Sequence, residues 1–183
     1  YRSHKDALDF IWESIAQDGG KRQHIYEKTK ELLKDGPFVL LTDSLSTIRF
    51  TTKRMDDIFP SIGDARWTNS RQMIAYQIVN KNGWARFSLL MGPGDQAFRK
   101  MIFTKLDGDR PEKWYRVARE MSPEFHTIRS SEPIIRAEEY DDMDEEDIDN
   151  RLEAILSYEK NPLFKEVDDY FEANKEYFRQ SQP

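Results

Sequence analysis

Basic residues interleaved with aromatic ones occupy the middle of this sequence, between residues 49 and 136. This region carries 16 Lys and Arg against 10 Asp and Glu, although the whole chain has a formal net charge of -6. Such cations can follow a phosphate backbone, and neighbouring aromatic rings can stack on nucleic-acid bases. The solvated face of an ordinary sheet also carries Arg and Lys, so both interpretations stay open. The candidate binding residues are Arg49, Arg66, Arg71, Lys81, Arg86, Gly92, Gly94, Arg99 and Lys100.

A glycine-rich turn connects a predicted strand, residues 84–91, to a predicted basic helix. The turn is Gly92-Pro93-Gly94, and Asp95 then begins a helix that carries Arg99 and Lys100. Backbone N–H groups at a helix N-terminus bind anions, which makes this turn a candidate phosphate cradle. The alternative is a purely structural turn in which glycine supplies a positive φ angle.

The residues for catalysis are not arranged in any recognisable motif. A restriction-type nuclease core needs Asp/Glu-x-Lys beside a further acidic residue to hold Mg²⁺, and no Asp or Glu here is followed two positions later by Lys. The acidic run 138–149 lacks the central glycine of a calcium loop, and the chain has no Cys. We therefore predict no metal or cofactor in this chain. An enzyme would have to bring distant carboxylates together, for example Asp43, Asp64 and Asp95.

Length and charge predict one α+β unit in three segments. Residues 1–36 read as two helices separated by Gly19-Gly20, and residues 37–136 as an antiparallel sheet of four to five strands packed with helices. The strongest local signal is Asn82-Gly83, which predicts a hairpin between residues 72–80 and 84–91. Residues 137–183, with 5 Lys and Arg against 16 Asp and Glu, read as acidic helices that pack on the sheet.

No apolar stretch is long enough to span a bilayer, and no signal peptide opens the sequence. We therefore expect a cytoplasmic protein without membrane contact. The chain begins at Tyr1 and not at Met, which suggests a fragment of a longer protein.

A second hypothesis makes the chain a protein-interaction or dimerisation module. The last predicted helix begins at Pro162 and carries an apolar, aromatic-rich stripe at helical spacing, and exposed patches of that kind mark protein partners. The residues of this stripe proposed for self-association are Leu163, Val167, Tyr170, Phe171 and Phe178.

Residues 38–160 resemble the C-terminal half of a bacterial group of PD-(D/E)xK nuclease-superfamily proteins. The similarity lies in the strand STIRFTT, the hairpin ending ARFSLLMGPGD, the helix beginning QAFRKMIF and the acidic helical tail, with Gly92, Pro93, Gly94 and Arg99 at matching positions. The resemblance implies a Mg²⁺-dependent restriction or phage-defence nuclease whose core lies upstream, and no catalytic residue carries over to this chain. We expect a non-catalytic accessory domain that helps to engage DNA or RNA.

Overall fold

A five-stranded antiparallel sheet and six helices make up the part of the chain that the structure describes, and the predicted α+β class is confirmed. The computed structural model describes the backbone of residues 2–111 and 114–180 and the side chains of residues 19–111, 114–129 and 132–179. The elements in chain order are α1 (Arg2–Asp35), β1 (Phe38–Ser44), β2 (Thr47–Thr52), α2 (Lys53–Ile58), β3 (Ile74–Lys81), β4 (Trp84–Met91), α3 (Gln96–Asp109), β5 (His126–Ile135), α4 (Glu145–Leu156), α5 (Pro162–Ala173) and α6 (Lys175–Gln180).

The strands form a simple meander in the order β1-β2-β3-β4-β5. The predicted hairpin is confirmed: Lys81 pairs with Trp84 across the turn, where Gly83 adopts a φ of 81°. The apolar run at residues 38–41 lies in β1. The last strand, β5, has an irregular register against β4.

The prediction of two N-terminal helices is wrong, because α1 continues without a break through Gly19-Gly20. Each glycine costs a helix about 1 kcal/mol relative to alanine, a penalty that favourable packing can offset. The second half of α1 supplies this packing, since Ile25 and Leu33 are buried in the core and Lys21 donates to the carbonyl oxygen of Tyr140. The prediction of helices from residue 137 onward is also corrected. Residues 137–142 form a turn, and α4 begins only after Asp144, which caps it.

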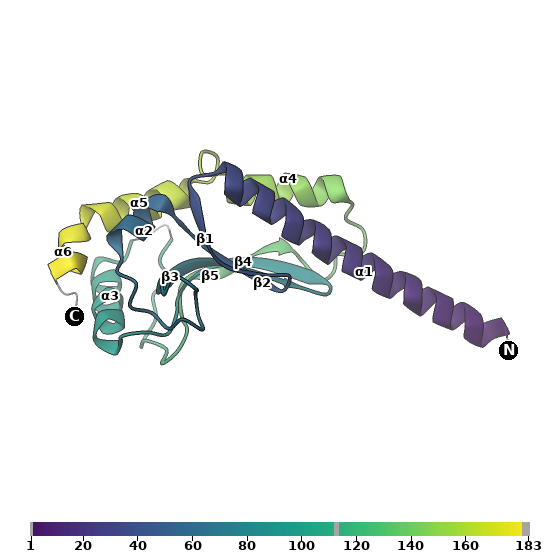
Figure 1. The fold of residues 1–183 in the computed structure, drawn as a ribbon, viewed down its shortest axis with the longest axis horizontal. Coiled ribbons are helices and arrows are strands. Elements are labelled where there is room, and N and C mark those ends of the chain that lie inside the picture. Colours follow the sequence, from purple (N-terminus) through teal and green to yellow (C-terminus); the bar gives the residue numbers. More distant parts are fainter. Residues whose placement is uncertain (1, 112–113, 181–183) are drawn as a thin grey trace.

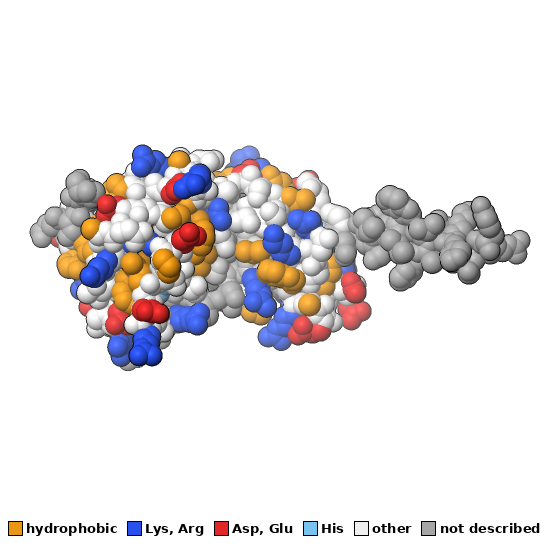
Figure 2. Space-filling view, turned by 90° about the horizontal axis from the view of Figure 1, so that it is seen from below, with side chains coloured by type: hydrophobic (Ala, Val, Ile, Leu, Met, Phe, Trp, Pro, Cys, Tyr) orange, Lys and Arg blue, Asp and Glu red, His pale blue; other side chains and the backbone are white. Residues whose placement is uncertain are grey.

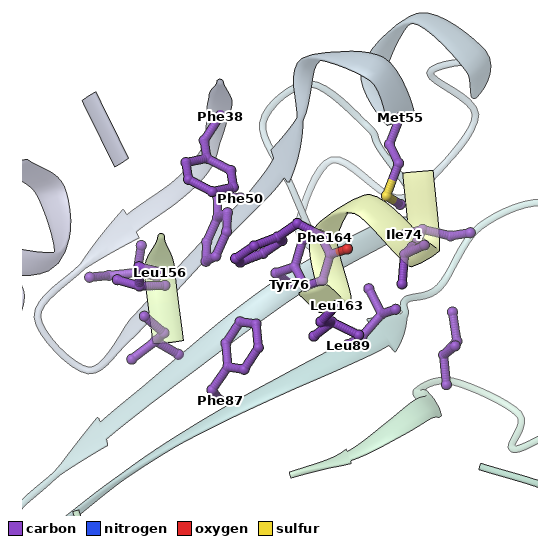
Figure 3. Packing of buried hydrophobic residues seen from close by; sticks show 14 of the residues in the cluster. Phe38, Phe50, Met55, Ile74, Tyr76, Phe87, Leu89, Leu156, Leu163 and Phe164 are labelled. Carbon is purple, nitrogen blue, oxygen red and sulfur yellow. The ribbon is translucent and has the colours of Figure 1, made fainter. Parts of the chain in front are cut away.

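Helices α1, α4 and α5 lie on one side of the sheet, and α3 stands at one end of it (Figure 1). Alternate strand residues such as Phe50, Tyr76 and Phe87 face these helices and are buried. Phe164 of α5 packs among them, with its ring centroid 4.9 Å from those of both Phe38 and Tyr76 (Figure 3). Residues from all three predicted segments therefore share one hydrophobic core.

The C-terminal stripe lies inside this core. Leu163, Val167, Phe171 and Phe178 are at most 2% exposed, and Tyr170 is partly buried with its hydroxyl donating to Asp109. The expectation that the last helix packs against something is met within the chain itself. This corrects the proposed role of the stripe, because its buried members are not accessible to a second copy.

No helix in the described part of the chain is both long and apolar enough to cross a lipid bilayer.

We predict that Phe164→Ala lowers the free energy of unfolding by about 3–5 kcal/mol, because it empties a fully buried aromatic site. Urea denaturation followed by circular dichroism measures the loss. Phe125→Ala is the matched control, since that ring is 51% exposed and its removal should cost less than about 1.5 kcal/mol. Equal losses in the two variants would contradict the central place of α5 in the core.

Candidate nucleic-acid interface

The second face of the sheet is not covered by α1, α4 or α5 (Figure 1). Directly paired residues share a face, so Arg49, Gln77 and Ser88 lie side by side on β2, β3 and β4, and Arg86 follows two residues along β4. The view in Figure 2 looks at the molecule from this side, where Lys and Arg side chains lie between hydrophobic ones. We call this surface the open face.

Trp67 covers one end of the open face. It belongs to the loop between α2 and β3 and packs on Leu41 and Ala75, forming a small apolar cluster separate from the main core. The guanidinium carbon of Arg49 lies 4.0 Å from the Trp67 ring centroid, which is a cation–π contact. Arg49 also donates to the Gln77 side-chain oxygen at 2.8 Å and to the Trp67 carbonyl oxygen at 3.0 Å. All of these partners are neutral.

Close packing, and not a positive φ angle, explains the two glycines of the turn. A Cβ atom on Gly92 would lie 2.2 Å from the Trp67 ring, and one on Gly94 would lie 2.8 Å from the Cα atom of Gly63. Among the described glycines only Gly83 has a positive φ. The predicted phosphate cradle is filled by the chain itself, because the Asp95 carboxylate caps α3 and accepts the N–H of Phe98 at 2.7 Å.

A hollow of about 320 Å³ opens beside Trp67, and we call it the Trp67 hollow. At its rim Phe125 is 51% exposed and lies 5.4 Å from the Trp67 ring, centroid to centroid. Arg66 donates to Asp64 at 2.7 Å, and this hydrogen bond lowers the pKa of Asp64 to about 2. The residues that line the hollow are Arg49, Asp64, Arg66, Trp67, Pro93, Glu124 and Phe125.

A second hollow, of about 350 Å³, lies at the other end of β4, and we call it the Trp84 hollow. The guanidinium carbon of Arg86 lies 5.2 Å from the Trp84 ring centroid. Arg86 is exposed and has no hydrogen bond or ion pair with any described residue, and exposed Lys81 is the strand partner of Trp84. The lining residues are Trp84, Arg86, Pro133, Ile135, Arg136, Ala137 and Glu138.

The sheet register sets the spacing of the two hollows. Two strand spacings of about 4.8 Å and a two-residue rise of about 3.4 Å each separate the Cα atoms of Arg49 and Arg86 by about 12 Å. The structure therefore brings Arg49, Arg66, Lys81 and Arg86 to two ends of one surface. The sequence already showed an aromatic residue close to two of the arginines, because Trp67 follows Arg66 and Trp84 is two residues before Arg86. No pattern in the sequence indicated that Phe125 lies at this surface.

The other predicted basic residues have different surroundings. Arg99 is fully buried and donates to the backbone carbonyl oxygens of Ser122, Pro123 and Glu124, so its expected role at an exposed basic surface is corrected. Arg71 donates to the Gly63 carbonyl oxygen at 3.0 Å, and this hydrogen bond joins the two sides of the loop that contains Trp67. Lys100 is exposed on α3, outside both hollows.

The three distant carboxylates do not form a shared site. Asp43 pairs with Lys30 at 2.7 Å, Asp64 pairs with Arg66, and Asp95 caps α3. Within the described residues, no group of three or more His, Asp or Glu side chains could hold a metal ion.

Comparison of the chain with protein-family models, curated proteins and solved structures finds no match. The resemblance to PD-(D/E)xK proteins therefore stays a prediction.

We predict that Asp64 titrates near pH 2, and that Arg66→Met returns its pKa toward the ordinary value of 3.8. Because the pKa is lowered in the folded state, the pair stabilises the fold above about pH 4, and this stabilisation disappears as the pH falls toward 2. Carbon-13 NMR of the carboxyl group measures both values. Lys100→Met is the control, since Lys100 is exposed on α3 outside the Trp67 hollow and is not among the groups that shift the pKa of Asp64.

A further prediction concerns the adjacent residues Arg99 and Lys100. Arg99→Gln should lower the free energy of unfolding by about 1.5–3 kcal/mol, because three carbonyl groups lose a charged donor. Lys100→Gln should change it by less than about 0.5 kcal/mol, because the side chain is exposed. Chemical denaturation of the two variants measures the difference. Equal stability would contradict the structural role of Arg99.

Proposed function

We propose that this chain is a non-catalytic accessory domain that binds nucleic acid through the open face of its sheet. The observation that carries the proposal is the pair Arg49 and Arg86. Each guanidinium group lies over a tryptophan ring on the same face, and neither has a carboxylate partner in the described part of the chain. An arginine with free charge beside an aromatic plane suits a ligand that has both phosphates and flat bases.

Two cations on the helical side of the molecule, Lys28 and Arg54, differ in this respect. Lys28 lies within 4 Å of Asp149 and Glu153, and Arg54 pairs with Asp169 at 2.8 Å. Their charges are balanced by neighbours, whereas those of Arg49 and Arg86 are not. A free cation attracts an anionic ligand more strongly than one already paired, so the open face is the favoured side for a polyanion.

The accessory role rests on the sequence resemblance and on the missing catalytic motif. In this proposal the chain is part of a larger bacterial PD-(D/E)xK protein of the cytoplasm, whose Mg²⁺-dependent core lies outside residues 1–183. The open face would then add affinity for DNA or RNA to a reaction carried out elsewhere in the protein.

The test is binding of fluorescently labelled oligonucleotides, single-stranded and duplex, at low salt. Affinity for the preferred form should fall steeply as salt is added, because bound phosphates release counterions. The double variant Lys81→Ala with Arg86→Ala should bind more weakly and reduce the slope of log K against log salt by about 1 to 2. Both side chains are exposed, so the fold should be unaffected.

The charge-matched control is Lys34→Ala with Lys160→Ala, which removes two exposed cations outside the hollows of the open face. It should leave the salt dependence unchanged. The proposal fails if neither form of oligonucleotide binds, or if the two double variants lose affinity equally.

A further inference from the structure

We infer that the ligand of the open face is a single strand, which places one unstacked base in the Trp67 hollow and one in the Trp84 hollow. This inference rests on the proposed function and adds the class of nucleic acid to it.

The two hollows have the same three chemical parts. Each contains a tryptophan ring and an arginine that has no carboxylate partner, Arg49 in one and Arg86 in the other. Each also contains an exposed glutamate, Glu124 or Glu138, whose side chain makes no hydrogen bond with any described residue. Similar sets of groups at two places on one face indicate two similar moieties of a repeating ligand.

The glutamates favour a base over a phosphate inside each hollow. A phosphate group there would meet a carboxylate of the same charge, which is unfavourable. A nucleobase instead offers N–H donors that a carboxylate accepts, as Glu does from the amino group of cytosine. Trp84 in one hollow and the half-exposed Phe125 in the other supply a stacking surface for the base, since Trp67 itself is only 3% exposed and lies under Arg49. The arginine in each hollow can reach the adjoining phosphate.

Only an unpaired base can use these groups together. In a duplex the flat faces are stacked on neighbouring pairs and the Watson–Crick edges are occupied, so a protein meets groove edges and phosphates. Sequence-specific RNA recognition and single-strand binding instead use splayed bases on aromatic side chains. Phe125 fits the second mode, because half of its ring is exposed at the rim of the Trp67 hollow.

The spacing of the hollows suits a short strand. The separation of about 12 Å between Arg49 and Arg86 corresponds to roughly two to four nucleotides, given 3.4 Å per stacked nucleotide and a longer step when the strand is extended. The strand would cross β2, β3 and β4 diagonally, over Gln77 and past Ser88, which is buried. Gln77 is only partly buried and can donate or accept there.

Arg99 acts as a positioning residue for this surface. Its guanidinium group donates to the carbonyl oxygens of Ser122, Pro123 and Glu124, the three residues that precede Phe125. The buried cation thereby holds the segment that carries both Glu124 and Phe125 at the rim of the Trp67 hollow.

The experiment compares three probes of about twelve nucleotides, a length within the site sizes of small single-strand-binding folds. They are a single strand, its duplex, and a fully abasic strand of the same length, which keeps every phosphate but has no bases. Fluorescence anisotropy at one fixed low salt concentration gives the affinities. The intact strand should bind about tenfold more tightly than the abasic strand, and more tightly than the duplex.

A variant at Phe125 tests whether this residue contributes to the preference for a strand that carries bases. Phe125→Ala should weaken binding of the intact strand several-fold and leave binding of a fully abasic strand unchanged, because the ring contacts bases and not phosphates. Tyr177→Ala removes another exposed aromatic ring, on α6, and should change neither affinity. Circular dichroism checks that both variants are folded.

The outcomes separate this inference from the proposed function. Equal affinity for the duplex and the single strand, or equal affinity for the intact and abasic strands, overturns the single-strand inference while nucleic-acid binding stands. Absence of binding to all three probes overturns the proposed function itself, and with it the inference.

Discussion

Packing of α5 against the inner face of the sheet is the interaction on which the rest of the molecule depends. Phe164 fills the centre of the aromatic cluster, and Asp168, one turn further along, is buried beside it. The Asp168 carboxylate accepts hydrogen bonds from the hydroxyl groups of Thr52 at 2.5 Å and Tyr158 at 2.8 Å, while burial raises its pKa. A buried carboxylate is costly unless it is hydrogen-bonded, so these contacts fix the position of α5 along β2. The apolar residues Leu163, Phe164, Val167 and Phe171 of α5 are buried in this contact.

Because the helices α1, α4 and α5 pack on the inner face of the sheet, they leave its open face uncovered. Its apolar residues near β1 and β3 have no helix above them, and Trp67 covers them instead. Trp67 fits only because residue 92 has no side chain, and Arg49 stacks on the ring, which is only 3% exposed. The same local contacts that shield apolar surface also create a hollow with a cation and a flat ring. Stability and the candidate site are thus built from the same residues at this end of the sheet.

Local signals in the sequence predicted local structure well. Asn82-Gly83 located the hairpin, Asp95 the start of α3, and Pro162 the start of α5, since each acts through its own backbone geometry. Tertiary contacts determine the features that local sequence signals did not predict. The continuity of α1 at Gly19-Gly20 depends on the packing of its second half in the core and on the contact of Lys21 with Tyr140. The burial of Arg99 depends on three carbonyl groups more than twenty residues away. The Trp67 hollow likewise joins residues from 49 to 125, a grouping that no motif or spacing reveals.

The net charge of the chain does not oppose binding of a polyanion at the open face. At physiological ionic strength exposed charges interact over about 8 Å, so the local balance matters more than the total. Much of the acidic excess lies in residues 137–183, and several of these carboxylates already have partners on the helical side: Asp149 contacts His24 and Lys28, and Glu139 binds Arg151. These pairs keep their carboxylates on the helical side, and of the described residues of the acidic segment only Ala137 and Glu138 line a hollow of the open face. The positive charge of Arg49 and Arg86 is left for a ligand from outside.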